Sequence, residues 1–105
     1  MDVLVRIKQL VVRGAVRFTD KAREEMADDG LSRPEVIESI LSARRIDKTI
    51  RSTSPWRKRA AEKLYVIKSF SYTGTKVYTK GKIDHEGDFE YFYVLISAKI
   101  DQDIH

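Results

Sequence analysis

The chain has 105 residues and a net charge of +4; 42% of its residues are apolar, 34% are charged and none is cysteine. This length and apolar content suit one hydrophobic core, so we expect residues 1–105 to form a single domain. The lack of cysteine excludes disulfides, thiolate nucleophiles and cysteine-ligated zinc, and it agrees with a cytoplasmic protein.

Three helices are predicted in the first part of the chain. Apolar residues recur at helical spacing in the opening segment, at Leu4, Ile7, Leu10 and Val11. Gly14 follows as a helix stop, and Thr19 is placed to cap a second helix that runs toward Gly30. Ser32–Glu35 has the spacing of a capping box, with proline in the first turn, and begins a third helix. We interpret Val16–Phe18 as a short link between the first two helices.

After Ala43 the pattern changes from helices to strands. Four strands are predicted, at Arg45–Ser52, Lys63–Phe70, Lys76–Ile83 and Phe89–Ile100. Polar turns separate the last three, at Tyr72–Thr75 and Asp84–Asp88. Three helices followed by neighbouring strands predict an α+β fold in which N-terminal helices pack on a mostly antiparallel sheet.

Positive charge is concentrated between Arg44 and Lys82. This segment holds twelve of the twenty basic residues and only two acids, Asp47 and Glu62, so it carries a net charge of +10. The residues before it carry −1 and those after it carry −5. Such clustering indicates a polyanionic partner, for example RNA. The alternative is a solvated surface whose charges are merely uneven.

Side chains alternate across a strand, which predicts the faces of two of these strands. Four residues of the third predicted strand share one face: Lys76, Tyr78, Lys80 and Lys82. In the last strand we expect Phe92, Val94, Ile96 and Ala98 to face the helices, and Tyr91, Tyr93, Leu95, Ser97 and Lys99 to face away. The open face would then carry lysines that neutralise phosphates and tyrosines that stack on bases. An ordinary solvated face remains the alternative.

The same side chains suit RNA cleavage without a metal. Attack by the 2′-OH needs a base, cations around the phosphate, and an acid for the leaving 5′-oxygen. Lysine and arginine supply the cations, and crowded cations are expected to lower the pKa of a neighbouring tyrosine or lysine. Paired carboxylates for a two-metal nuclease are not evident, because we interpret Glu24–Glu25 and Asp28–Asp29 as exposed helix faces. His85 and His105 are isolated, so we expect no metal and no cofactor.

Four segments carry a resemblance to a known family. They are Leu4–Thr19 with the helix to Leu41, Ile46–Ile50, Val77–Lys80 and Leu95–Lys99. In this order they resemble the MqsR-type toxins of the RelE/ParE superfamily of bacterial toxin–antitoxin systems. The resemblance implies a RelE-like fold and a cytoplasmic mRNA endonuclease, free or bound to the ribosome. It also implies a protein antitoxin as partner, often one with a small zinc-binding domain.

The resemblance also assigns roles to individual residues. Lys48, Tyr78 and Lys99 match catalytic positions; the lysines would stabilise the scissile phosphate, and Tyr78 would act as acid, base or stacking group. Four further residues would bind flanking phosphates of the RNA: Arg51, Arg57, Lys80 and Lys82. An alternative alignment places Tyr65 and Lys68 on the tyrosine–lysine strand instead.

Two other functions fit the same features. One is a non-catalytic module that binds RNA or an acidic partner on the basic face. The other is a ParE-like toxin that binds a protein target and performs no chemistry. A membrane protein is not expected, because no apolar run approaches the ~20 residues of a spanning helix. No signal peptide is evident either, since charged residues interrupt Leu4–Val12.

Overall fold

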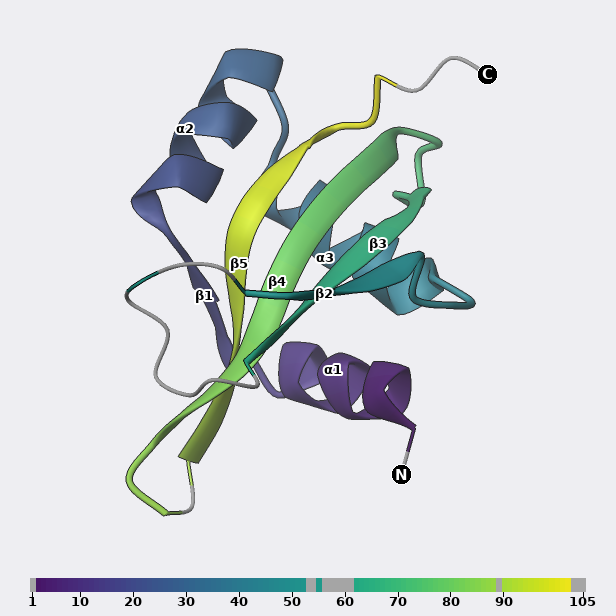
Figure 1. Cartoon of the computed structure of the whole chain (residues 1–105). Helices are drawn as coiled ribbons and strands as arrows, with labels where there is room; N and C mark the ends of the chain where they lie inside the picture. Colours follow the sequence, from purple (N-terminus) through teal and green to yellow (C-terminus); the bar gives the residue numbers. More distant parts are fainter. Residues whose placement is uncertain (1, 53–54, 56–61, 89, 103–105) are drawn as a thin grey trace.

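The structure, a computed structural model, describes residues 2–52, 55, 62–88 and 90–102. In this part of the chain the helices are α1 (Val3–Val12), α2 (Asp20–Asp29) and α3 (Arg33–Ser42). The strands are β1 (Val16–Phe18), β2 (Lys48–Arg51), β3 (Lys63–Phe70), β4 (Lys76–Glu86) and β5 (Glu90–Ile100) (Figure 1). They form one sheet in the order β1-β5-β4-β3-β2, in which only β1 and β5 are parallel. The predicted α+β class with a mostly antiparallel sheet is confirmed.

The helices begin and end where the sequence predicts. Thr19 accepts a hydrogen bond from the backbone N–H of Ala22, and Gly30 ends α2 in the left-handed conformation at φ 65°. Ser32 and Glu35 form the predicted capping box, since the Glu35 carboxylate accepts the Ser32 N–H at 3.0 Å and Ser32 accepts the Glu35 N–H. These caps satisfy N–H groups that have no partner inside the helix.

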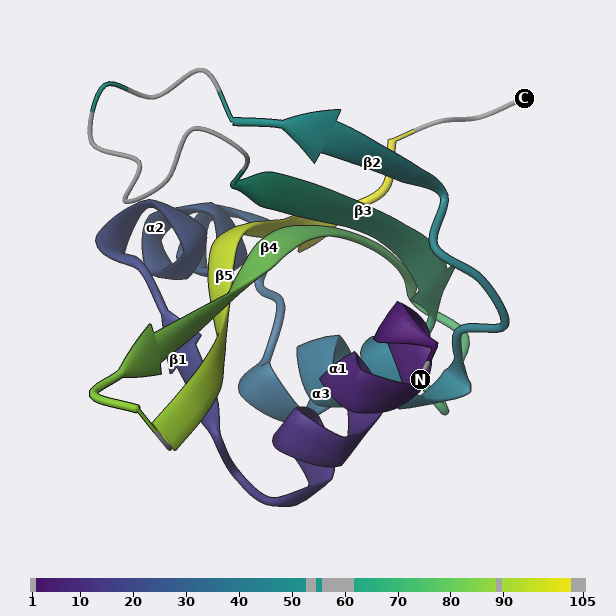
Figure 2. The same ribbon diagram turned by 60° about the horizontal axis from the view of Figure 1, so that its bottom comes forward.

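The sheet is curved, and α1 and α3 lie together under one of its faces (Figure 2). No described helix covers the opposite face, which we call the open face. The third helix, α2, lies beside β5 at the side of the sheet that also carries β1 (Figure 1). In the described part of the molecule, α1 and α3 therefore form a layer on one face of the sheet, and the other face has no helix over it.

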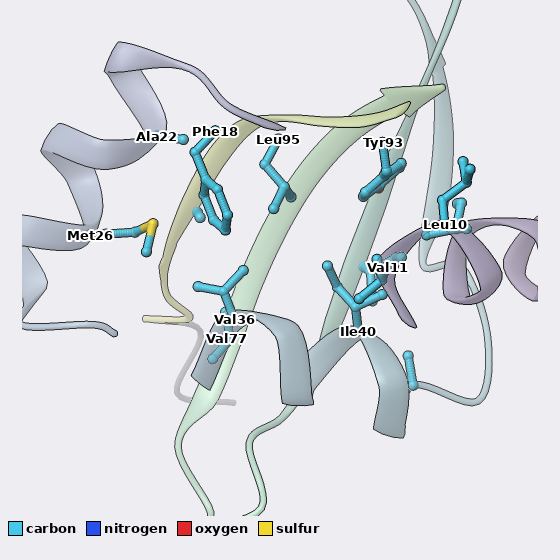
Figure 3. Close-up of a cluster of buried hydrophobic side chains, with 14 of the residues drawn as sticks. Leu10, Val11, Phe18, Ala22, Met26, Val36, Ile40, Val77, Tyr93 and Leu95 are labelled. Carbon is cyan, nitrogen blue, oxygen red and sulfur yellow. The ribbon is translucent and has the colours of Figure 1, made fainter. Parts of the chain in front are cut away.

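The hydrophobic core fills the space between the helices and the covered face of the sheet (Figure 3). Val36 and Ile40 of α3 are fully buried there, opposite Val77 of β4 and Leu95 of β5. The apolar residues predicted from helical spacing in α1 are all buried: Leu4, Ile7, Leu10 and Val11. Each fully buried side chain of this size contributes roughly 1.5–3 kcal/mol to folding.

The segment Val16–Phe18 is a strand, so its interpretation as a short link is wrong. It runs parallel to β5, with Val16 opposite Tyr93 and Phe18 opposite Leu95. A strand of three residues is too short to show a period in its sequence. β1 forms because α1 and the turn after it place Val16–Phe18 beside the edge of β5.

The other strands form with changed limits. β3 occupies Lys63–Phe70 as predicted, whereas β2 is shorter than expected. β4 continues to Glu86, so the predicted turn at Asp84–Asp88 is confined to Gly87 and Asp88. The predicted start of the last strand, Phe89, lies outside the described residues.

A β-bulge in β5 changes the alternation of its side chains. Lys80 of β4 lies opposite Ser97, but the next residue, Gly81, lies opposite Leu95. Ile96 is therefore an extra residue on β5, and the faces exchange on either side of it.

The prediction for the faces of β5 was wrong before this bulge and correct after it, where Ser97 and Lys99 pair with Lys80 and Tyr78 of β4. Tyr93 and Leu95 were expected on the open face, yet both are fully buried in the core. Phe92 and Val94, which were expected against the helices, are half-buried on the other face. Ala98 was expected in the core and is fully buried there, because the bulge has shifted the pattern by one residue.

Two carboxylates of α2 bind the edge of β5 that β1 does not reach. Glu25 accepts the backbone N–H of Ala98 at 3.3 Å, and Asp29 accepts that of Ile100 at 2.8 Å. The interpretation of Glu25 and Asp29 as exposed is therefore wrong, although the acids directly before each of them are exposed. Unpaired N–H groups at a strand edge invite pairing with another chain, and these contacts prevent it.

Replacing Tyr93 with phenylalanine is expected to leave the free energy of unfolding unchanged or to raise it by about 1 kcal/mol. The Tyr93 hydroxyl is buried and has no hydrogen-bond partner in the described part of the chain. Burial accordingly raises the pKa of Tyr93. A buried hydroxyl without a partner is a cost that phenylalanine removes. Urea denaturation measures the change, with the exposed Tyr91→Phe as control. A loss above about 1 kcal/mol would mean that this hydroxyl is hydrogen-bonded after all.

Candidate functional site

The open face carries the polar side chains of β4, as the alternation predicts. Val77 and Thr79 are fully buried against the helices. Tyr78 and Lys80, which alternate with them along β4, lie on the other face and are half-buried. Residues that pair across neighbouring strands lie on the same face, so the register identifies their neighbours.

Tyr78 lies between two lysines on the open face. Lys68 of β3 pairs with Tyr78 on one side, and Lys99 of β5 pairs with it on the other. The Lys99 ammonium lies 5.3 Å from the centre of the Tyr78 ring, within range of a cation–π interaction. The structure therefore brings Tyr78 and Lys99 together as expected, and it adds Lys68. We call these three residues the Lys–Tyr–Lys row.

A cavity of about 430 Å³ opens at the Lys–Tyr–Lys row. Its lining comprises the row and four residues from α2 and the end of β5: Asp29, Ile100, Asp101 and Gln102. The Asp101 carboxylate lies 3.6 Å from the Lys76 ammonium, and Asp29 accepts the Ile100 N–H through its Oδ2. Cations, a phenol and carboxylates thus meet in one cavity, which is a set of groups that can donate and accept protons.

Burial raises the pKa of the Tyr78 hydroxyl. The positive charge of Lys68 opposes this shift, and the negative charges of Glu25, Asp101 and Asp47 add to it. The expectation that crowded cations lower the pKa of a neighbouring tyrosine is therefore wrong for Tyr78, because desolvation outweighs the lysine. Tyr78 is protonated at neutral pH and suits a proton donor better than a base.

Lys48 is exposed and does not line this cavity. It pairs with Val66 of β3, which in turn pairs with Lys80 of β4. One whole strand therefore separates Lys48 from β4, and strand spacing makes that about 10 Å. Lys48 shares the open face with the row but does not lie beside Tyr78.

The four expected RNA-binding residues have different environments. Lys80 is half-buried on the open face. Lys82 lies 3.3 Å from the Glu62 carboxylate, and the two side chains are only 18% and 11% exposed, so the charge of Lys82 is balanced inside the protein. Arg51 is exposed and follows the alternation of β2 onto the face opposite Lys48. Arg57 lies outside the described residues.

Sequence reasoning missed Asp29 and gave Lys68 only through an alternative alignment. The four-residue spacing of Glu25 and Asp29 places both on one side of α2, which is a signal that two acids share a neighbour. For Lys68 no local signal decides the face, because apolar residues occur on both sides of β3: Val66 and Ile67 are each buried.

In the described part of the chain, no three side chains among His, Asp and Glu lie close enough together to hold a metal ion. No helix in the described ranges is long and apolar enough to cross a membrane.

Comparison with known proteins gave no match: no family model, no curated protein and no solved structure matches this chain. A fold by itself does not determine a function, since one fold supports many. The features of this chain that bear on function are the side chains of the open face and the cavity at the Lys–Tyr–Lys row.

Proposed function

We propose that this chain is a metal-independent endoribonuclease that binds single-stranded RNA on the open face and cleaves it at the Lys–Tyr–Lys row. One observation carries the proposal: a tyrosine whose raised pKa keeps it protonated lies between two lysines, in a cavity that also holds carboxylates. The net charge of +10 between Arg44 and Lys82 supports a polyanionic substrate.

The proposed reaction is attack of the RNA 2′-OH on the adjacent phosphorus. Asp29 accepts the 2′ proton, while Tyr78 donates its proton to the 5′-oxygen as the P–O bond breaks. Lys68 and Lys99 stabilise the charge that develops on the phosphate oxygens. The products are a 2′,3′-cyclic phosphate and a 5′-hydroxyl. Asp29 then releases the 2′ proton to water and the Tyr78 anion takes up a proton from water, so both groups return to their starting states.

The resemblance to MqsR-type toxins extends this proposal to a biological role. In that role the chain is the toxin of a type II toxin–antitoxin system, acts on mRNA in the cytoplasm, and is neutralised by a protein antitoxin. A neighbouring short reading frame with zinc-ligand cysteines would support the pairing. Co-purification of its product with this chain in a stable complex, and loss of RNA cleavage in that complex, would test it directly.

A second candidate is a non-catalytic module that binds RNA on the same face. Two observations favour it: Lys48 lies a strand away from β4, and Lys82 is balanced by Glu62. The residues assigned by resemblance therefore do not all converge on one phosphate.

The purified protein is expected to cleave single-stranded RNA in the presence of EDTA and to leave 2′,3′-cyclic phosphate ends. RNA affinity should fall steeply as salt rises, because phosphate binding releases counterions. Gel analysis of the products measures cleavage, and titrations at several salt concentrations measure affinity.

Binding without cleavage would favour the non-catalytic module. Growth inhibition in cells whose RNA stays intact would favour a toxin that binds a protein target. No binding and no cleavage, with or without ribosomes, would overturn both RNA functions.

A further inference from the structure

A second cavity of about 590 Å³ lies on the molecule beside the end of β3. Seven residues line it: Ser42, Arg44, Arg45, Lys68, Ser69, Phe70 and Ser71. Three of these are cations, three are serines and none is an acid. Lys68 also lines the cavity at the Lys–Tyr–Lys row, so the two cavities are neighbours that share one wall.

The position of this cavity follows from the short length of β2. β2 pairs with β3 only over Lys63–Val66, so no described strand pairs with the end of β3 on that side. The end of α3 is fixed there instead, because the Ser42 hydroxyl donates to the Phe70 carbonyl at 2.6 Å and lies 3.1 Å from the Ser69 hydroxyl. The walls of the cavity are therefore held by hydrogen bonds.

The arginines of this cavity carry unbalanced positive charge. Arg44 and Arg45 are exposed, and neither forms an ion pair with a described residue. By contrast, Arg17, Lys76 and Lys82 each lie within 4 Å of a carboxylate of the described residues. Two arginines beside each other, with no acid in the cavity, favour a phosphate as ligand, because their guanidinium groups match its oxygens.

Phe70 gives the cavity an exposed aromatic surface. Its side chain is 52% exposed, and it lies two residues from Lys68, on the same face of β3. A phenylalanine exposed in this way, beside cations that suit a phosphate, is the combination that binds single-stranded nucleic acid by stacking a base.

We propose that the second cavity binds the nucleotide next to the dinucleotide whose linking phosphate is held at the Lys–Tyr–Lys row. Arg44 and Arg45 bind the phosphate of this further nucleotide, Phe70 stacks on its base, and Lys68 lies between this phosphate and the one that is cleaved. This subsite rests on the proposed function, since it assumes that RNA occupies the first cavity. It gives the RNA a path from the centre of the open face to the edge of β3.

The test compares two 2′-O-methyl RNAs, which cannot be cleaved: a dinucleotide and an oligomer of about eight nucleotides. The Arg44→Ala/Arg45→Ala variant should bind the oligomer about 10- to 100-fold more weakly, and its slope of log affinity against log salt should become shallower by about 0.7, the value for one phosphate of a single strand. Phe70→Ala should weaken oligomer binding about 5- to 100-fold with the slope unchanged, and Phe70→Trp should restore it. Dinucleotide binding should change little in each variant.

The matched control is Arg13→Ala/Lys21→Ala, which removes the same charge from two exposed residues, neither of which forms an ion pair with a described residue. It should leave oligomer binding close to that of the unmodified protein. RNA binding that is insensitive to the changes at Arg44, Arg45 and Phe70 would overturn the subsite and leave the proposed function standing. Equal losses in the control and the arginine variant would also overturn it, because the arginines would then act only through net charge. Failure of the unmodified protein to bind either RNA would overturn both proposals.

Discussion

Replacing Tyr78 with phenylalanine is expected to lower the rate of RNA cleavage by about 10²- to 10⁴-fold, the range for loss of a general acid. Phenylalanine keeps the ring over which the Lys99 ammonium lies, so RNA affinity should change little. Single-turnover cleavage with excess protein measures the rate, and titration with uncleavable RNA measures the affinity. The exposed Tyr91→Phe is the matched control and should cleave at the normal rate.

The dependence of this rate on pH distinguishes an acid from a base at Tyr78. Because burial raises the pKa of Tyr78, its protonated form persists to higher pH than in an ordinary tyrosine. An acid at this position keeps kcat/KM high until the pH exceeds the ordinary tyrosine value of about 10, and the rate declines above it. A base at this position would instead give a rate that rises as the pH approaches that value. Cleavage by Tyr78→Phe at the normal rate would contradict a proton-donor role.

The helices could be predicted because their signals are local. The Ser32–Glu35 capping box, the Thr19 cap and the Gly30 stop each lie within a few residues of the helix end they fix. The apolar spacing of α1 then predicts which side is buried. Each of these features depends on a hydrogen bond or a contact inside one short segment, so it can be recognised without knowing the partners of that segment.

The faces of β5 could not be predicted, because they depend on pairing with another strand. The bulge at Ile96 exists only in the register with β4, where Lys80 and Gly81 lie opposite Ser97 and Leu95. Tyr93 shows the consequence: unbroken alternation placed it on the open face, but its side chain is buried in the core.

Some features of the candidate site could likewise be expected from the sequence, and others could not. Tyr78 and Lys99 belong to strands that follow each other in the chain, so they could be expected on neighbouring strands. Only the bulge places them directly opposite each other, because the register of Gly81 with Leu95, continued without it, would place Ala98 opposite Tyr78. The separation of Lys48 from Tyr78 depends on the strand order β4-β3-β2, and the pairing of Lys82 with Glu62 joins residues twenty positions apart. Spacing along the chain cannot reveal either feature, because the first depends on strand order and the second on a contact between strands.

Replacing Gly81 with alanine is expected to lower the free energy of unfolding by about 2 kcal/mol, because it overfills the core. The φ of Gly81 is not positive, so its backbone conformation does not require glycine. Glycine is required because there is no space for a side chain. A β-carbon at this position would lie 2.6 Å from Cζ and 2.7 Å from the hydroxyl oxygen of Tyr93. Tyr93 is fully buried, so its ring has no room to withdraw. Urea denaturation measures the loss.

A double-mutant cycle identifies the Tyr93 ring as the cause of that loss. In a Tyr93→Leu background the ring is gone, and Gly81→Ala should then cost nothing or gain about 0.5–1 kcal/mol, the ordinary advantage of alanine over glycine in a strand. In a Tyr93→Phe background the atom at 2.6 Å is still present, so the cost should remain. A cost that is the same in all three backgrounds would contradict the close packing of Gly81 on Tyr93.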